Sequence, residues 1–280
     1  MTLTLAIGAT IIATVLAAGF YRQRQRSLNL QRQLQAAARD LEHLQNACAR
    51  LAPAGVVQSL VADGIQPDEG PTAERKSATA LFVDLVGFTA MSDRVEPEIL
   101  LRIINGYYEC VSGAVEEHRG HVGSFVGDGI VAYFGAIRPN PWQCDDAVHA
   151  ALAMRASIRA YSAELAREGL PPIAIGIDHG PGLAGLLGSH ARREYAFIGR
   201  PVNLAARLQA LTRIHGVDIL VSEALCAELD PGFILSPMPA AAVKGFAEPV
   251  LTYAVEGRSA HMEMGADPRA PARSNRDLSW

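Results

Sequence analysis

The chain has 280 residues, and its 25 Lys and Arg against 29 Asp and Glu give a net charge of −4. This balance provides no basic face for nucleic acid, so no nucleic-acid partner is expected. After the first 21 residues there is no long apolar run, which excludes a multi-span transporter or channel. The four cysteines are widely spaced, a pattern that indicates neither a zinc site nor a disulfide framework.

Residues 1–21 contain no charged side chain, and as a helix the run from residue 3 to residue 21 would be about 28 Å long, enough to cross a bilayer once. The basic residues Arg22, Arg24 and Arg26 follow this run, whereas those of a cleaved signal peptide precede it. We therefore expect a single-pass anchor in the inner (cytoplasmic) membrane, with a cleaved signal peptide as the alternative. The positive-inside rule predicts that the chain after the anchor lies in the cytoplasm.

Residues 22–52 contain neither Gly nor Pro and are predicted to continue as a helix. Apolar residues recur every seven positions in two series, the pattern of two helices that wrap around each other in parallel. The series are Leu30, Ala37, Leu44 and Leu51, and Leu34, Leu41 and Cys48. A coiled-coil connector is thus predicted, and an amphipathic helix packed on its own domain is the alternative. Residues 53–73 are predicted to be a linker, and residues 257–280 a disordered tail.

Residues 74–256 form the predicted folded domain. Apolar patterns alternate between strand and helix, and a hairpin signal of the Asp-Gly type stands at 127–129. In chain order we predict a strand at 77–85, a helix at 96–118, a hairpin at 121–134, a helix at 145–168, a strand at 171–180, a helix at 202–216 and strands near 218–222 and 249–256. The order strand, helix, hairpin, helix, strand is a split βαβ arrangement. It predicts an α+β fold with one sheet covered by helices.

Two carboxylates are expected to meet at one end of this sheet. Asp84 ends the first strand, and Asp128 lies at the tip of the hairpin. Two carboxylates in one place raise each other's pKa, and a bound divalent cation usually balances their negative charges. The alternative is that each Asp is an ordinary turn or cap residue. The glycine-containing turn at 86–89 favours a phosphoryl or nucleotidyl transfer site, because backbone N–H groups before a helix can hold phosphate oxygens.

Five segments of the sequence carry a resemblance to a known family: FVDLVGFT, RGHVGSFVGDGIVAYFG, IGIDHGPGLAGLLGS, REYAFIGRPVNLAARLQ and VKGFAEPVLTYAV. In this order and spacing they resemble the catalytic domain of class III adenylate and guanylate cyclases, in a membrane-anchored bacterial type. The resemblance covers residues 74–256 and implies a ferredoxin-like βαββαβ domain that forms a head-to-tail homodimer, with each active site at the interface. It also implies a reaction in which the ribose 3′-hydroxyl of a nucleoside triphosphate attacks the α-phosphate and pyrophosphate leaves.

The same resemblance implies two divalent cations, Mg²⁺ or Mn²⁺, as cofactors. Asp84 and Asp128 match the two metal-binding aspartates of the family, and the carbonyl of Leu85 matches its backbone metal ligand. Other positions match groups that hold the triphosphate. These positions are Val86, Gly87, Phe88, Thr89 and Lys244.

Two further residues match groups that the partner chain contributes to the active site. Asn203 corresponds to the residue that orients the ribose, and Arg207 to the residue that stabilises the transition state. They are four positions apart on a predicted helix and therefore share one face, as joint contact with one substrate requires. A surface salt bridge is the alternative role for Arg207.

The positions that recognise the base differ from the family pattern. Adenylate cyclases usually carry Lys four residues before the second metal aspartate and Asp or Thr seven residues before the catalytic Asn, whereas this sequence has Ser124 and Ala196. The Glu and small polar residue of guanylate cyclases are also missing. Three interpretations stay open: a permissive adenylate cyclase, favoured because ATP is the commonest substrate of the family; a cyclase for GTP or a pyrimidine nucleotide; and an inert dimeric signalling relay. A diguanylate cyclase is excluded because the GGDEF-type turn is absent, and a P-loop NTPase because GLAGLLGS lacks the required lysine.

Overall fold

The structure is a computed structural model that describes residues 25, 35, 39, 73–165, 170–188 and 193–259. The chain divides into two compact units, Met1–Val57 and Gln58–Trp280, and the fold described below is that of the second unit. The predicted anchor, the seven-residue repeat, the linker up to residue 72 and the tail beyond residue 259 lie outside the described residues. In the part of the chain that the structure describes, no helix has the length and apolar character needed to cross a membrane.

One sheet of eight strands forms the centre of this unit, in the order β2-β3-β1-β4-β6-β8-β7, with β5 paired to β4. The strands are β1 (Ala73–Leu85), β2 (His121–Val126), β3 (Gly129–Phe134), β4 (Ile173–Gly188), β5 (Arg193–Ile198), β6 (Ile219–Ser222), β7 (Phe233–Ala241) and β8 (Val250–Arg258). Strand β1 lies between β3 and β4 and pairs antiparallel with both. The first four strands therefore have the predicted βαββαβ arrangement, and the α+β class is confirmed.

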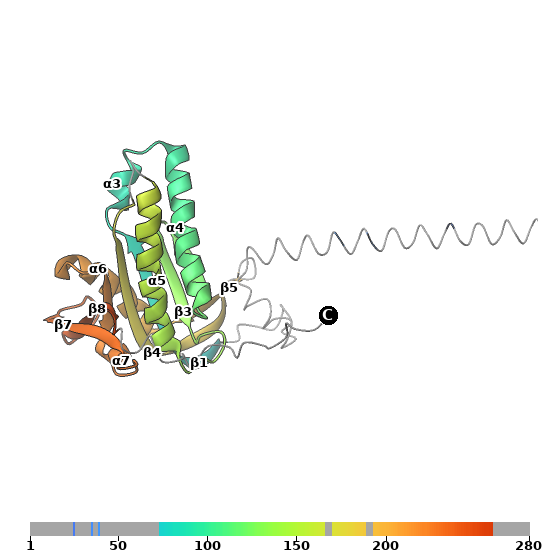
Figure 1. Ribbon diagram of the computed structural model, residues 1–280. Helices are drawn as coiled ribbons and strands as arrows, with labels where there is room; N and C mark the ends of the chain where they lie inside the picture. Colours follow the sequence, from blue (N-terminus) through green and yellow to red (C-terminus); the bar gives the residue numbers. More distant parts are fainter. Residues whose placement is uncertain are drawn as a thin grey trace, which may run out of the picture. The chain divides into compact units, whose positions relative to one another are not determined.

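The helices that cover the sheet are α3 (Phe88–Ser92), α4 (Pro97–Glu117), α5 (Gln143–Glu164), α6 (Arg200–His215) and α7 (Glu223–Cys226). Helices α4 and α5 lie side by side (Figure 1). The buried side chains of α4 recur at helical spacing, as at Ile103, Tyr107 and Val111. Tyr107 and Val111 pack with Val148 and Met154 of α5 in the main hydrophobic core. Both long helices were predicted, the first of them from this spacing, and both are confirmed.

Helix α6 packs directly against β4. A Cβ atom at Gly176 of β4 would lie 2.1 Å from the carbonyl oxygen of Ala205 in α6, so only glycine allows this approach. The register of β4 with β1 places Ala174 opposite Asp84, two residues from Gly176. The close contact therefore holds the C-terminal half of α6 near the end of β1.

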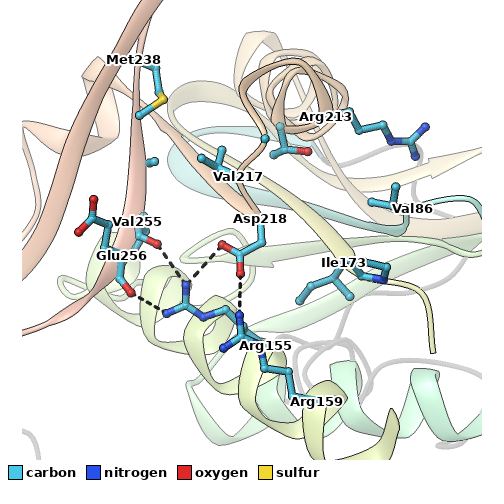
Figure 2. Close-up of a pocket in the computed structure, with 14 residues that line it drawn as sticks. Val86, Arg155, Arg159, Ile173, Arg213, Val217, Asp218, Met238, Val255 and Glu256 are labelled. Atoms are coloured by element: carbon cyan, nitrogen blue, oxygen red, sulfur yellow. Dashed lines mark hydrogen bonds and ion pairs between the residues drawn. The ribbon is translucent and has the colours of Figure 1, made fainter. Parts of the chain in front are cut away.

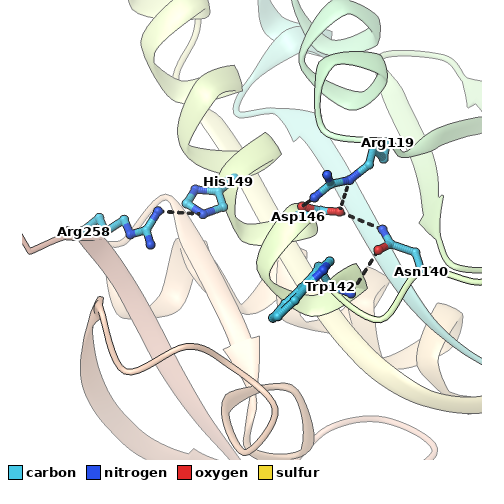
Figure 3. Close-up of polar contacts among 6 residues, drawn as sticks. All are labelled: Arg119, Asn140, Trp142, Asp146, His149 and Arg258. Carbon is cyan, nitrogen blue, oxygen red and sulfur yellow. Dashed lines mark hydrogen bonds and ion pairs between the residues drawn. The ribbon is translucent and has the colours of Figure 1, made fainter. Parts of the chain in front are cut away.

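A buried carboxylate joins the end of α4 to the start of α5 (Figure 3). Asp146 is 2% exposed and accepts hydrogen bonds from Arg119 Nε at 2.9 Å, Arg119 Nη2 at 2.6 Å and Asn140 Nδ2 at 2.7 Å. Arg119 has a φ of 61°, a left-handed conformation that is uncommon for a residue other than glycine. One turn further along α5, Arg258 Nη1 donates to His149 Nε2 at 3.2 Å. These contacts connect α5 to the end of α4 and to the last residue of β8.

The structure differs from the sequence-based expectation at several strand ends. Strand β1 begins at Ala73, the last residue of the predicted linker. Its start was not predicted because its first five residues are largely exposed and show no apolar pattern. Strand β4 continues to Gly188, eight residues past the predicted end, and β8 continues to Arg258, inside the predicted tail. Strand β7 was not predicted, since its sequence FILSPMPAA contains two prolines. It lies at the edge of the sheet, where a missing backbone donor is tolerated.

Candidate active site

Asp84 and Asp128 meet at one end of the sheet, as predicted. The antiparallel register pairs Val83 with Ile130, so the last residues of β1 lie beside the turn between β2 and β3 that carries Asp128. The pKa of Asp84 rises from 3.8 to about 7, first because of burial and then because of a hydrogen bond with Asp128 and its charge. The two carboxylates are therefore close enough to oppose each other's ionisation.

Three donors surround the Asp84 carboxylate. The Leu85 backbone N–H donates to Oδ1 at 3.0 Å, Gln209 Nε2 donates to Oδ2 at 3.2 Å, and Arg213 Nη2 lies 3.0 Å from the same Oδ2. Gln209 and Arg213 come from α6 of the same chain. Neither residue was predicted: Gln209 is the last residue of the segment REYAFIGRPVNLAARLQ but matches no expected site position, and Arg213 lies beyond that segment. Their only sequence signal is that they stand four positions apart on one helix face.

Two tyrosines of α4 complete this end of the sheet. Tyr107 is fully buried, its hydroxyl has no hydrogen-bond partner among the described residues, and its pKa is raised by burial and then by the charges of Asp84 and Asp128. The Tyr108 hydroxyl donates to the Gly127 carbonyl at 2.5 Å and so holds the turn that carries Asp128. Tyr107 was expected only as an apolar position of the helix, and the sequence assigned no role to Tyr108.

This oxygen-rich end of the sheet fits a divalent cation. Asp84 and Asp128 are hard oxygen donors of the kind that Mg²⁺ and Mn²⁺ prefer. The raised pKa of Asp84 indicates that its negative charge is not fully balanced by its neighbours. The Tyr107 hydroxyl likewise lacks a hydrogen-bond partner among the described residues. Leu85, whose carbonyl is the third predicted ligand, is the last residue of β1 and directly follows Asp84.

In the predicted triphosphate-binding turn, one backbone N–H group already has a hydrogen-bond partner within the fold. The Val86 N–H donates to the Pro172 carbonyl at 2.8 Å and is not free to bind phosphate. Gly87 has a φ of 84° and precedes α3, a left-handed conformation that favours glycine. The backbone N–H groups of Gly87, Phe88 and Thr89 therefore remain as the candidate phosphate donors of this turn.

Asn203 and Arg207 lie on a different face of α6 from Gln209 and Arg213. Both are exposed, and positions 203 and 209 are about 120° apart around the helix axis at 3.6 residues per turn. Lys244 is also exposed, in the turn after β7. Across the residues that the structure describes, no hydrogen bond or ion pair joins Asn203, Arg207 or Lys244 to the two aspartates. The single chain thus brings the carboxylates together and leaves the other catalytic candidates apart from them.

The two positions that were expected to recognise the base are in β2 and β5, two strands that are not paired with each other in the sheet. Ser124 is in β2, directly after an irregularity at Gly123, and Ala196 is in β5, opposite Gly185 of β4. Both are partly buried, and β2 and β5 contact each other. Neither position carries the Lys, the Asp or Thr, or the Glu that the resemblance associates with recognition of the base.

Comparison with known proteins agrees with this geometry. Residues 71–257 match the adenylate and guanylate cyclase catalytic domain. An adenylate cyclase of Anabaena cylindrica is 32% identical over 186 residues, 64% of this chain and 36% of that protein. Adenylate cyclase 1 of Rhizobium meliloti is 29% identical over 206 residues, 72% of this chain and 31% of that protein. This chain thus spans about a third of the length of both curated relatives.

Solved structures show the same likeness. The adenylyl cyclase CyaB from P. aeruginosa superposes with a TM-score of 0.63 at 29% identity, over 68% of this chain and 98% of that one. The guanylyl cyclase Cya2 superposes with a TM-score of 0.63 at 27% identity, over 67% of this chain and 95% of that one. The sequence match extends over most of the chain and includes the whole described sheet except Arg258, the last residue of β8. The chain therefore belongs to the family of adenylate and guanylate cyclase catalytic domains.

Proposed function

We propose that this protein is a membrane-anchored nucleotide cyclase that converts ATP into its 3′,5′-cyclic monophosphate and pyrophosphate at a homodimer interface. The observation that carries the proposal is the division of α6 into two faces. Gln209 and Arg213 hold Asp84 of their own chain, whereas Asn203 and Arg207 are exposed on another face. A site with both sets of residues then requires a second copy of the chain.

In this proposal Asp84 and Asp128 provide the oxygen ligands for two divalent cations, with the Leu85 carbonyl as a further ligand. When bound, such cations lower the pKa of the 3′-hydroxyl and neutralise the triphosphate. Gln209 and the Leu85 N–H orient the Asp84 carboxylate. The partner's α6 contributes Asn203, which positions the ribose, and Arg207, whose charge stabilises the α-phosphate as its negative charge develops. Lys244 and the turn at 87–89 bind the triphosphate.

Complementation tests the shared site. Asp84→Asn and Arg207→Ala are each expected to inactivate the full-length protein. In a mixed dimer, one of the two sites combines an intact Asp84 from one chain with an intact Arg207 from the other. Random mixing of the two variants should therefore restore about one quarter of wild-type pyrophosphate release, because about half of the dimers are mixed and each has one intact site. Absence of any recovery would contradict a site built from two chains.

GTP is the second candidate substrate. Ser124 and Ala196 lack the groups that discriminate between bases, and the likeness to a guanylyl cyclase structure, at 27% identity, is nearly that to the adenylyl cyclase structure, at 29%. ATP is preferred because both named curated relatives are adenylate cyclases. Incubation of the full-length protein with each of the four common ribonucleoside triphosphates and Mn²⁺, with mass analysis of the product, decides between the substrates. If none of the four nucleotides gave a cyclic product, the inert dimeric signalling relay would be the remaining interpretation.

The membrane part of the proposal rests on residues 1–26 of the sequence. We propose that residues 1–21 span the inner membrane and that Arg22, Arg24 and Arg26 keep the cyclase domain in the cytoplasm. Residues 22–52 then pair with those of a second chain and raise the effective concentration of the two domains. The full-length protein should stay in the membrane pellet after an alkaline carbonate wash, and Ile12→Arg should release it. Release of the unaltered protein would contradict the anchor.

A further inference from the structure

The Asp84 carboxylate is already occupied by donors from its own chain. Gln209 and Arg213 both contact Oδ2, at 3.2 Å and 3.0 Å, and the Leu85 N–H contacts Oδ1. Of these donors, only Arg213 carries a full positive charge. A divalent cation that binds Oδ2 must therefore enter a position beside a guanidinium that repels it.

The two α6 donors differ in their freedom to move. Gln209 is 6% exposed and is fixed in the packing of α6, whereas the Arg213 side chain is 48% exposed. Arg213 also lines an open cavity of about 750 Å³ next to Val86 (Figure 2). The guanidinium can thus leave Asp84 and remain solvated, and Gln209 stays as the neutral donor to the carboxylate.

Two other arginines of the same cavity are engaged elsewhere. Arg155 donates to the carbonyls of Val255 and Glu256 and lies 3.4 Å from Asp218, and Arg159 lies 3.6 Å from Asp218 (Figure 2). Neither has a described contact with Asp84. Arg213 is therefore the arginine of this cavity whose charge is directed at the carboxylate.

We propose that Arg213 is a positioning residue whose guanidinium is a built-in counter-ion of Asp84, which a divalent cation must displace, so that this ion pair sets the cation concentration at which the site fills. The inference rests on the proposed function, because it requires Asp84 to be a cation ligand. Without a cation, the ion pair partly compensates the charge of the carboxylate and holds it in place. With a cation, the same pair is a competitor for Oδ2.

Direct cation binding tests this competition without any turnover. Free Mn²⁺ is measured by electron paramagnetic resonance while the full-length protein is titrated, with no nucleotide present. Arg213→Met removes the charge and keeps most of the side-chain length, and its Kd for Mn²⁺ should fall by about three- to tenfold. Arg213→Gln should shift the Kd in the same direction, and it carries the test if the Met variant does not fold. Arg213→Lys should stay closer to the wild type.

Arg159→Met is the matched control. It removes one arginine from the same cavity without touching Asp84, so its Kd for Mn²⁺ should stay within about twofold of the wild type, as expected for a largely exposed charge. Equal tightening in Arg159→Met and Arg213→Met would mean that only the general field changes, and would overturn the inference. Unchanged or weaker Mn²⁺ binding in Arg213→Met would also overturn it, because Arg213 would then only orient the carboxylate.

Asp84→Asn separates this inference from the proposed function. If Asp84→Asn binds Mn²⁺ as well as the wild type, the cation site itself is wrong, and the inference fails with it. If Asp84→Asn loses Mn²⁺ while Arg213→Met matches the wild type, only the role of Arg213 is wrong. Loss of Mn²⁺ in the first variant together with tighter binding in the second supports both.

Discussion

The carboxylate of Asp84 and the guanidinium of Arg213 lie 3.0 Å apart although 129 positions separate them in the chain. Asp84 is near the end of β1, and Arg213 is in the last turn of α6. The contact exists because α6 packs against β4 at Gly176, and β4 is the neighbour of β1 in the sheet. One face of α6 is thereby committed to the carboxylate of its own chain. The face with Asn203 and Arg207 stays available to a second copy.

Asp84→Asn should separate activity from stability. Nucleotide turnover should fall by at least about 100-fold, because a cation ligand is lost. The thermal midpoint of the cation-free protein should not fall, since the change removes a partly buried charge next to Asp128. Pyrophosphate release and circular dichroism measure the two effects. Asp93→Asn, the same chemical change at an exposed position, is the control and should leave both unchanged; a large loss of stability in Asp84→Asn would show a structural role instead.

Restoring polar groups at the base positions should sharpen substrate choice. The double variant Ser124→Lys and Ala196→Asp adds hydrogen-bonding groups in the contacting strands β2 and β5. A site that hydrogen-bonds a base discriminates far better than one that cannot. We expect the ratio of kcat/KM for ATP to that for GTP to rise by about tenfold or more, measured in competition with both nucleotides at equal concentration. Ser124→Ala is the control, and an unchanged ratio in the double variant would place base recognition elsewhere.

Asp146→Asn should destabilise the domain without touching the candidate site. The substitution leaves Arg119 and Asn140 facing a neutral, poorly matched group in a buried position. Loss of one partner from such a network costs about 3 kcal/mol. Urea unfolding of the full-length protein followed by circular dichroism measures the change in free energy of unfolding. Glu116→Gln, at an exposed position of α4, should change it by less than about 0.5 kcal/mol; equal effects of the two substitutions would contradict the prediction.

His121 should make the fold sensitive to acid. Burial lowers its pKa from 6.5 to about 4, and its Nε2 has no partner within the described part of the chain. Between these two values the unfolded chain binds more protons than the folded one, so the free energy of unfolding falls as the pH falls from about 6.5 to about 4. The full effect is at most about 3 kcal/mol.

The difference in unfolding free energy between the wild type and His121→Gln isolates this residue from the other histidines. It should shrink, or change sign, as the pH falls through that range, because the variant has no group to titrate there. Urea unfolding at half-unit pH steps measures it. Parallel curves for the two proteins would mean that His121 is not the acid-sensitive group.

The sequence by itself determined the fold class and the pair of aspartates. Helix α4 follows from the apolar spacing along its sequence, and the turn that carries Asp128 follows from Gly127 and Gly129 around it. These signals depend only on residues close together in the sequence, so they can be read without the tertiary structure. The βαββαβ order then brings Asp84 to Asp128, because the topology alone places the end of β1 beside the hairpin turn.

The tertiary structure decided which side chains serve which carboxylate. The sequence assigned no role to Gln209 or Arg213, because their role depends on how closely α6 approaches β4, which the absence of a Cβ at Gly176 permits. Strand β7 contains two prolines. The sheet tolerates them because β7 lies at its edge and pairs only with β8, among the described strands. A local pattern records the period of a helix or strand, but not the neighbour against which it packs. That is why the sequence predicted a cation site and only the fold revealed the guanidinium that competes for it.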